Sequence, residues 1–121
     1  MRDDRSSRYE PFSVTVVDVR DDGVMIIPVG ELDLACTDEL AREVRRARAS
    51  GSVRVVLDLR GIQFIDSAGL RLLLSLRNDA KRNGHRLILV PPGRAVGRIF
   101  EITATRGLFD CEDGGRTGTL P

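Results

Sequence analysis

The sequence predicts a single α/β domain with a mixed sheet of four to five strands and helices packed on it. Segments rich in β-branched and apolar residues alternate with segments that repeat apolar residues at helical spacing. Glycine or proline separates most of these segments, and the length of 121 residues suits one domain. The predicted order is β-β-α-β-α-β-α(-β), with an optional last strand, and it favours parallel later strands joined by right-handed crossovers.

The start of the chain predicts a tail and a hairpin. Residues 1–11 are polar, and we expect a flexible tail before a domain that spans residues 12–110. Residues 13–19 are β-branched and partly alternating, which is typical of a strand. An Asp-Gly turn leads to a second strand over residues 24–29. Pro28 inside this strand indicates an edge position or a bulge.

A helix and a buried strand are expected next. Thr37 is a good N-cap, acidic residues favour the first helical turn, and Gly51 ends the helix. Apolar residues at helical spacing mark its buried face: Leu40, Val44 and Ala47. Residues 53–59 are apolar on both faces, which predicts a central strand covered by helices.

A leucine-rich helix is expected to follow residues 66–69. So many leucines do not fit one narrow stripe, so its first half should be largely buried. Its second half is polar and stops at Gly84. Residues 86–90 then predict another buried strand, which Pro91 and Pro92 end.

The C-terminal part predicts a short helix and a tail. Residues 94–104 have helical spacing, with these residues facing inward: Val96, Ile99, Phe100 and Thr103. Residues 108–109 are the candidates for a last short strand. Residues 111–121 are rich in glycine, threonine and charge, and we expect a flexible tail.

Charge and hydropathy argue against several kinds of partner. Lysine and arginine number 19 against 18 acidic residues, so neither nucleic acid nor an acidic membrane surface is an expected partner. No apolar stretch approaches the ~20 residues of a membrane span, and the charged start is unlike a signal peptide. We therefore expect a cytoplasmic protein. Cys36 and Cys111 belong to no CxxC pair, which predicts two free thiols.

The sequence offers little for catalysis. His85 is its only histidine and lies at a turn, where a solvated side chain is usual. The spacing of a zinc site and the glycine-rich loop of a nucleotide site are both missing from the sequence. We therefore expect no enzymatic activity, no cofactor and no metal.

The most informative segment is a strand-to-helix junction, Phe-Ile-Asp-Ser-Ala-Gly-Leu, at residues 64–70. Asp66 or Ser67 can cap the helix by accepting hydrogen bonds from its free N–H groups. Gly69 costs about 1 kcal/mol of helix propensity relative to alanine, which indicates close approach of another backbone. A plain N-cap beside a small residue would explain the same residues. Phosphorylation of Ser67 would place an anion where a helix start tolerates it, and would affect a docked partner more than the fold.

A second strand-to-helix junction, Gly-Glu-Leu-Asp, occupies residues 30–33. If the neighbouring strands share one sheet, its loop lies at the same end of the domain as Ser67. The alternative is an ordinary turn whose acidic residues favour the following helix.

These two junctions, with Val-Val-Leu-Asp-Leu at residues 55–59 between them, resemble the STAS family. The family is named for sulfate transporters and anti-sigma factor antagonists. Its pattern includes Gly-Glu-Leu-Asp, then Val-Leu-Asp-Leu, then Phe-Ile/Met-Asp-Ser-Ser/Ala-Gly-Leu. The similarity covers about residues 12–110. Each motif alone is common, but the two at this separation are specific. The resemblance implies a STAS-type fold for the predicted α/β domain.

The resemblance also implies a bacterial anti-sigma factor antagonist, a regulator of transcription in stress response or sporulation. Its unphosphorylated form binds an anti-sigma factor serine kinase and thereby releases the sigma factor. The kinase, using ATP bound in its own site, phosphorylates the serine after the motif aspartate, and a metal-dependent serine phosphatase reverses this. That serine matches Ser67, and many members carry a second serine where Ala68 stands. The implied partner-binding residues are Asp33, Asp66, Ser67, Ala68, Gly69 and Arg71, with Arg77 as a further candidate.

Other functions remain open. A STAS subunit that regulates a membrane transporter without phosphorylation is the alternative, although the intact Asp66-Ser67 pair favours the antagonist. An enzyme is a third hypothesis, for which no nucleophile and base are evident. A solvated helix face would equally explain Arg71 and Arg77. We expect a monomer or a weak dimer.

Overall fold

The computed structural model describes residues 11–20 and 23–112. The centre of the predicted Asp-Gly turn and most of both predicted tails lie outside the described residues. The elements are, in chain order, β1 (Ser13–Val19), β2 (Gly23–Leu32), α1 (Thr37–Ala49), β3 (Arg54–Asp58), β4 (Ile62–Ile65), α2 (Ser67–Arg82), β5 (Arg86–Val90), α3 (Arg94–Ile102), a 3₁₀ turn (Arg106–Leu108) and β6 (Asp110–Cys111).

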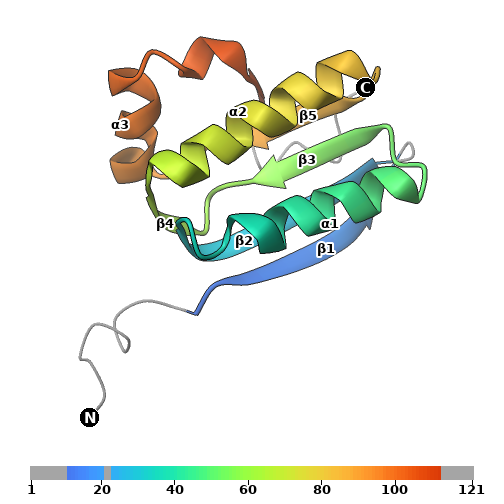
Figure 1. The fold of residues 1–121 in the computed structure, drawn as a ribbon, viewed down its shortest axis with the longest axis horizontal. Coiled ribbons are helices and arrows are strands. Elements are labelled where there is room, and N and C mark those ends of the chain that lie inside the picture. The colour runs from blue at the N-terminus through green and yellow to red at the C-terminus, as the bar shows by residue number, and fades with distance from the viewer. Residues whose placement is uncertain (1–10, 21–22, 113–121) are drawn as a thin grey trace.

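Five strands lie side by side in the order β1-β2-β3-β5-β6, and β4 pairs with β2 further along that strand. The β1–β2 pair is antiparallel and the other pairs are parallel. Helices α1 and α2 lie next to each other across one face of the sheet (Figure 1). The predicted α/β fold, a mixed sheet with helices packed on it, is confirmed.

Strand β2 changes neighbours along its length, and this change accounts for Pro28. Residues 23–26 pair with β3 and residues 30–32 pair with β4, with a register shift between Gly30 and Glu31. Pro28 lies between these two pairings, where the loss of a backbone donor is tolerated. The strand is therefore not an edge strand, but a local irregularity does accompany its proline.

The short strand β4 is not among the strands that the sequence predicts. It has four residues, with buried Ile62 and Ile65 at its ends and exposed Gln63 and Phe64 between them. This burial pattern lacks the alternation by which a strand is recognised in a sequence. Pairing with β2 makes it a strand, and that contact is remote in sequence.

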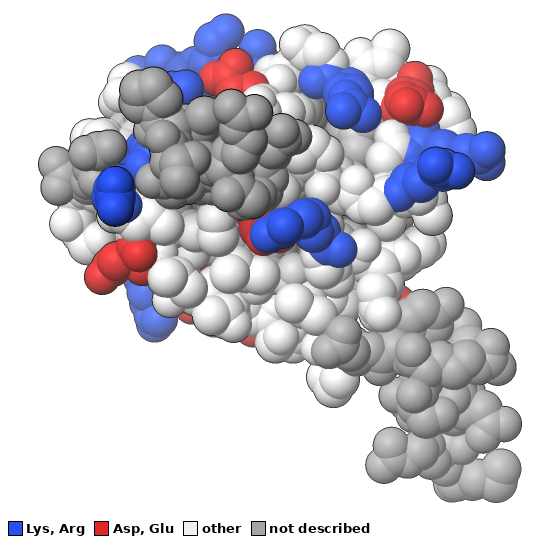
Figure 2. Space-filling model, turned by 180° about the vertical axis from the view of Figure 1, so that it is seen from behind, with Lys and Arg blue, Asp and Glu red and all other residues white. Residues whose placement is uncertain are grey.

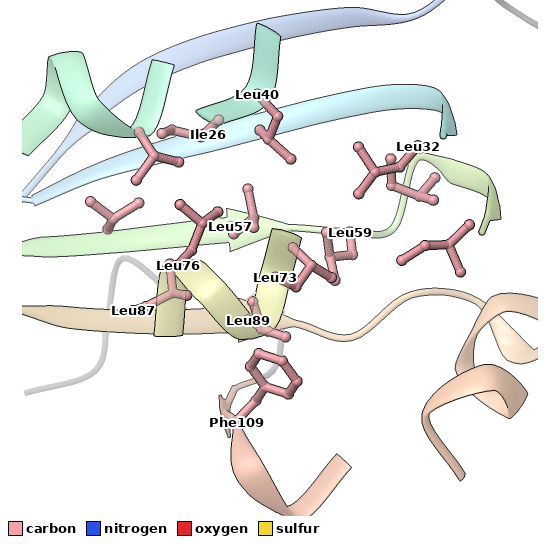
Figure 3. Packing of buried hydrophobic residues seen from close by; sticks show 14 of the residues in the cluster. Ile26, Leu32, Leu40, Leu57, Leu59, Leu73, Leu76, Leu87, Leu89 and Phe109 are labelled. Atoms are coloured by element: carbon pink, nitrogen blue, oxygen red, sulfur yellow. The ribbon is translucent and has the colours of Figure 1, made fainter. Parts of the chain in front are cut away.

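The core fills the layer between the sheet and the helices (Figure 3). The largest fully buried side chains come both from the helices and from the strands or the residue that follows β3: Ile26, Leu32, Leu40, Leu57, Leu59 and Leu73. The predicted inner face of α1 is confirmed, because Leu40, Val44 and Ala47 are buried. Phe100 and Phe109 pack edge to face, with ring centroids 5.9 Å apart, and extend the core at its C-terminal end.

The start of α1 differs from expectation. Cys36 occupies the N-cap position, and Thr37 is the first helical residue. The Thr37 hydroxyl donates to the Leu34 carbonyl at 3.2 Å, so it closes the preceding loop instead of capping helical N–H groups.

The C-terminal elements also differ from expectation. Helix α3 ends at Ile102, and Thr103 is exposed instead of facing inward. The last strand is Asp110–Cys111, after a 3₁₀ turn that includes Leu108. Residues 111 and 112, the first two of the predicted tail, lie within the described part of the chain. Cys111 belongs to β6, and the Glu112 N–H donates to the Leu89 carbonyl at 2.9 Å.

The face of the sheet opposite α1 and α2 is mostly uncharged in its described part (Figure 2). Strand register places Val17 opposite Met25 and Thr15 opposite Ile27. Side chains of one face meet directly across an antiparallel pair, so these contacts stabilise the β1–β2 ribbon.

Candidate functional site

The structure brings the two motif-bearing junctions together at one end of the domain. Strands β2 and β4 run parallel, with Leu32 opposite Ile65, so the chain leaves both strands at the same edge of the sheet. The loop before α1 and the start of α2 therefore lie side by side. We call this region, residues 32–36 and 64–71, the junction surface.

Asp66 joins the two junctions through its carboxylate and its backbone. Oδ1 accepts from the Gly69 N–H at 2.8 Å, which caps α2, and Oδ2 accepts from the Leu34 N–H at 3.2 Å. The Asp66 N–H donates to the Leu32 carbonyl at 3.3 Å. Of the two residues that sequence analysis left open as the cap, Asp66 fills this role. Its half-buried carboxylate thus organises the junction surface from within.

Gly69 is buried beneath this surface and allows the two backbones to touch. A side-chain Cβ at this position would collide with the Leu32 carbonyl oxygen and crowd the Ile65 side chain. The expectation that another backbone approaches Gly69 is confirmed, and that backbone is the end of β2. A buried residue without a side chain shapes the surface but offers a partner little to contact.

Ser67 is the first residue of α2 and is exposed. Because Asp66 supplies the cap, the Ser67 hydroxyl is not needed for helix initiation. Arg71 is also exposed and lies one helical turn further along, at the i+4 spacing that places it on the same helix face. Ala68 is half-buried and brings no hydroxyl to the site.

Asp33 holds the loop before α1 in place. Its Oδ1 accepts from the Ala35 N–H at 3.1 Å, and its carbonyl accepts from the Cys36 N–H at 2.9 Å. Burial raises the pKa of the Cys36 thiol, and a hydrogen bond with Asp33 and the charge of that carboxylate raise it further. Cys36 is therefore a neutral thiol at physiological pH, which does not suit a nucleophile.

Two apolar residues of the junction surface were not singled out from the sequence. Leu34 is 75% exposed and Phe64 is 48% exposed, although both are large and apolar. Leu34 follows the Gly-Glu-Leu-Asp motif, and Phe64 opens the second motif, so each could be taken for an ordinary strand or turn residue. Their exposure beside Asp66 depends on the β2–β4 pairing.

Arg77 does not lie at the junction surface. It is in the second half of α2, where its Nε donates to the Leu108 carbonyl at 2.6 Å. Its Nη1 donates to Asn78 Oδ1 at 2.9 Å. These bonds tie Arg77 to the 3₁₀ turn, away from Ser67.

The described residues contain no group of three or more side chains that could hold a metal ion. Over the same residues, no helix has the length and apolar character to cross a membrane. What the junction surface offers is an exposed hydroxyl, exposed apolar side chains and a cation.

Comparison with known proteins gives a family and a fold. The family model described as "STAS domain" matches residues 15–114, most of the chain. An anti-sigma-B factor antagonist of Staphylococcus aureus (strain NCTC 8325 / PS 47) is 28% identical over 85 residues, which cover 70% of this chain and 79% of that relative.

Solved structures agree on the architecture. The anti-sigma factor antagonist SpoIIAA in its unphosphorylated form superposes with a TM-score of 0.71 at 20% identity, over 87% of this chain and 92% of that chain. The Bacillus cell fate determinant SpoIIAA in the phosphorylated form gives 0.66 at 19% identity, over 87% and 96% of the two chains. At these identities the likeness establishes the fold.

Proposed function

The chain belongs to the STAS domain family, and from this we propose that it is an anti-sigma factor antagonist switched by phosphorylation of Ser67. In its unphosphorylated form it binds an anti-sigma factor serine kinase in the cytoplasm and so releases a sigma factor. The similarity to a curated anti-sigma-B factor antagonist supports the regulatory class. The observation that carries the switch is the exposed hydroxyl of Ser67 at a helix start that Asp66 already caps.

Ser67 is suited to phosphorylation because its hydroxyl is not needed to cap α2: the Asp66 carboxylate already accepts from the Gly69 N–H. The kinase reaches an exposed side chain, and the added phosphate brings about −1.5 to −2 charges. The free N–H groups and dipole of the α2 start tolerate an anion there, so the domain stays folded. A docked partner, by contrast, meets new bulk and charge in its interface. A metal-dependent serine phosphatase restores the binding form.

The exposed apolar residues of the junction surface would supply the contact area. Leu34 and Phe64 flank the Asp66 contact, and apolar side chains at the centre of an interface dominate its affinity. Arg71 adds a cation that an acidic residue of the kinase can pair with. Ala68 follows Ser67 in the first turn of α2 and is half-buried. A phosphate on Ser67 would clash with a partner docked on this surface.

The test is capture of the partner from the source organism by wild type, Ser67→Ala and Ser67→Asp. Ser75→Asp is the matched control, because Ser75 is an exposed serine on the same helix two turns further along. Wild type, Ser67→Ala and Ser75→Asp should retain an anti-sigma factor with a serine kinase domain, and Ser67→Asp should lose it. With ATP added, mass spectrometry should find phosphate on Ser67 of the wild type.

Equal capture by all four proteins would reject the switch and leave Ser67 as a simple first helical residue. Capture of a transporter component in place of a kinase would favour the transporter-subunit alternative. For the contact surface, Leu34→Ala and Phe64→Ala should weaken capture at least tenfold. Val53→Ala is the control, since Val53 is 53% exposed but precedes β3, at the opposite end of the sheet.

A further inference from the structure

A polar hollow lies at the far end of α2 from Ser67. It is formed by the second half of α2, the start of β5 and the segment from the 3₁₀ turn to β6, and its volume is about 290 Å³. Its charged and titratable lining residues are Arg77, Lys81, His85, Arg86 and Asp110. Lys81 lies fourteen positions after Ser67 on α2, which corresponds to a rise of about 21 Å. The hollow is thus distinct from the junction surface.

The hollow has more cationic than anionic side chains. Three cationic side chains and one imidazole line it, together with a single carboxylate, that of Asp110. The ion pairs formed within residues 11–20 and 23–112 involve neither Lys81 nor Arg86. A helix C-terminus favours cations, which explains Lys81 on α2. It does not explain Arg86, which belongs to the next strand and brings a second cation to the same hollow.

One donor of the hollow, the guanidinium of Arg77, is held in a fixed position. Arg77 is anchored through Nε to the Leu108 carbonyl at 2.6 Å, which fixes the plane of its guanidinium. The backbone N–H of His85 donates to the Ala80 carbonyl at 2.9 Å, and the backbone N–H of Arg86 donates to the Val53 carbonyl at 2.8 Å, so the backbone at the start of β5 is held in place. The side chains of Lys81 and Arg86 are exposed at the hollow. A donor ordered before binding, such as Arg77, loses less entropy when a ligand arrives.

The imidazole of His85 also lines the hollow. Its Nδ1 is buried without a hydrogen-bond partner.

We propose that this hollow binds a phosphate group, either free or carried by a small phosphate ester. A phosphate offers acceptor oxygens in several directions and a charge that matches cations converging from a helix and a strand. A water molecule occupies about 30 Å³ of liquid, so the hollow accommodates a phosphate together with bound water. A planar carboxylate would satisfy fewer of these donors at once.

The single histidine allows a direct test on the full chain. Its imidazole protons are followed by NMR at one fixed pH while inorganic phosphate is added, with ionic strength held constant by potassium chloride. Phosphate should produce a saturable shift that potassium chloride alone does not produce. A parallel titration with glycerol 3-phosphate decides between the sources: tighter binding identifies an ester as the ligand, and weaker binding identifies free phosphate.

Arg86→Gln should weaken the phosphate affinity at least tenfold, because it removes a charge-assisted hydrogen bond. Lys81→Gln should act in the same direction. Arg98→Gln is the matched control, since Arg98 is an exposed arginine on α3 outside the hollow, and it should bind as the wild type does. A non-saturable shift, or equal affinity in Arg86→Gln and the wild type, would overturn the proposal. Circular dichroism of each variant verifies that it is folded.

Discussion

At Gly69, two backbones that are 37 positions apart in the chain come into contact, because the Leu32 carbonyl occupies the space of a side chain. Gly69→Ala would gain helix propensity, but its Cβ would collide with a backbone atom that cannot rotate away. We expect a net loss of about 1–3 kcal/mol in the free energy of unfolding. Urea denaturation measures this loss.

Gly97→Ala is the matched control for this prediction. Gly97 is also inside a helix, α3, but apart from its chain neighbours and the backbone of its own helix, no atom lies within 4 Å of the position that its Cβ would occupy. Alanine should therefore raise stability here by about 0.5–1 kcal/mol through helix propensity alone. A gain at both glycines would contradict the close contact between the start of α2 and β2.

The Asp58–Arg60 pair should make stability depend on pH. Burial raises the pKa of Asp58, but hydrogen bonds from Arg60 and its charge outweigh burial, so the pKa of Asp58 lies below its ordinary value. The Arg60 Nη2 to Asp58 Oδ2 distance is 2.8 Å. A carboxyl with a lowered folded-state pKa contributes stability above its unfolded pKa of about 3.9 and loses it as pH falls through the folded value.

Asp58→Asn should therefore be less stable than the wild type at neutral pH, by about 1–3 kcal/mol. The difference should shrink below about pH 4, as Asp58 of the wild type takes up a proton. Urea denaturation across this pH range gives the free energy of unfolding against pH for both proteins. Subtracting one curve from the other removes the contributions of other carboxyls, such as Asp79, that both proteins share. A difference that stays constant with pH would mean that folding does not change the pKa of Asp58.

For α2 as an element, the structure separates the residue that starts the helix from the residue proposed to be modified. Asp66→Ala removes the hydrogen bonds to Gly69 and Leu34, and so both the cap and the tie to the neighbouring loop. We expect a loss of about 1–2 kcal/mol. Ser67→Ala leaves both bonds intact and should change stability by less than about 0.5 kcal/mol. Thermal denaturation of the pair measures this, and similar losses would mean that Ser67 shares the cap.

The elements also show what local sequence could and could not predict. Helix α1 and strand β3 were predictable because apolar spacing reports directly which face is buried. Strand β4 was not, because its four residues gain their ladder only from β2, about thirty positions earlier. The same remote pairing exposes Leu34 and Phe64 together, so the apolar part of the junction surface was not visible in the sequence.

In the whole molecule, topology gives the two motifs their shared location. A chain that enters β2 and β4 in the same direction must leave both at one edge, so the loop before α1 and the start of α2 meet there. The motifs identified the residues, but not which of them support the surface from beneath and which remain exposed on it. Asp33, Asp66 and Gly69 build the surface from beneath, whereas Ser67 and Arg71 remain exposed upon it.

This division predicts that a negative charge at Ser67 leaves the fold unchanged. Ser67→Asp places a carboxylate in the first turn of α2, where the helix dipole contributes about 0.3–1 kcal/mol, while the adjacent Asp66 repels it. The two effects oppose each other, so the free energy of unfolding should stay within about 0.5 kcal/mol of the wild type. Amide spectra should change only around residues 33–36 and 64–71. A broad loss of dispersed signals would instead mean that the charge acts by unfolding α2, and loss of partner binding in that variant would then report instability.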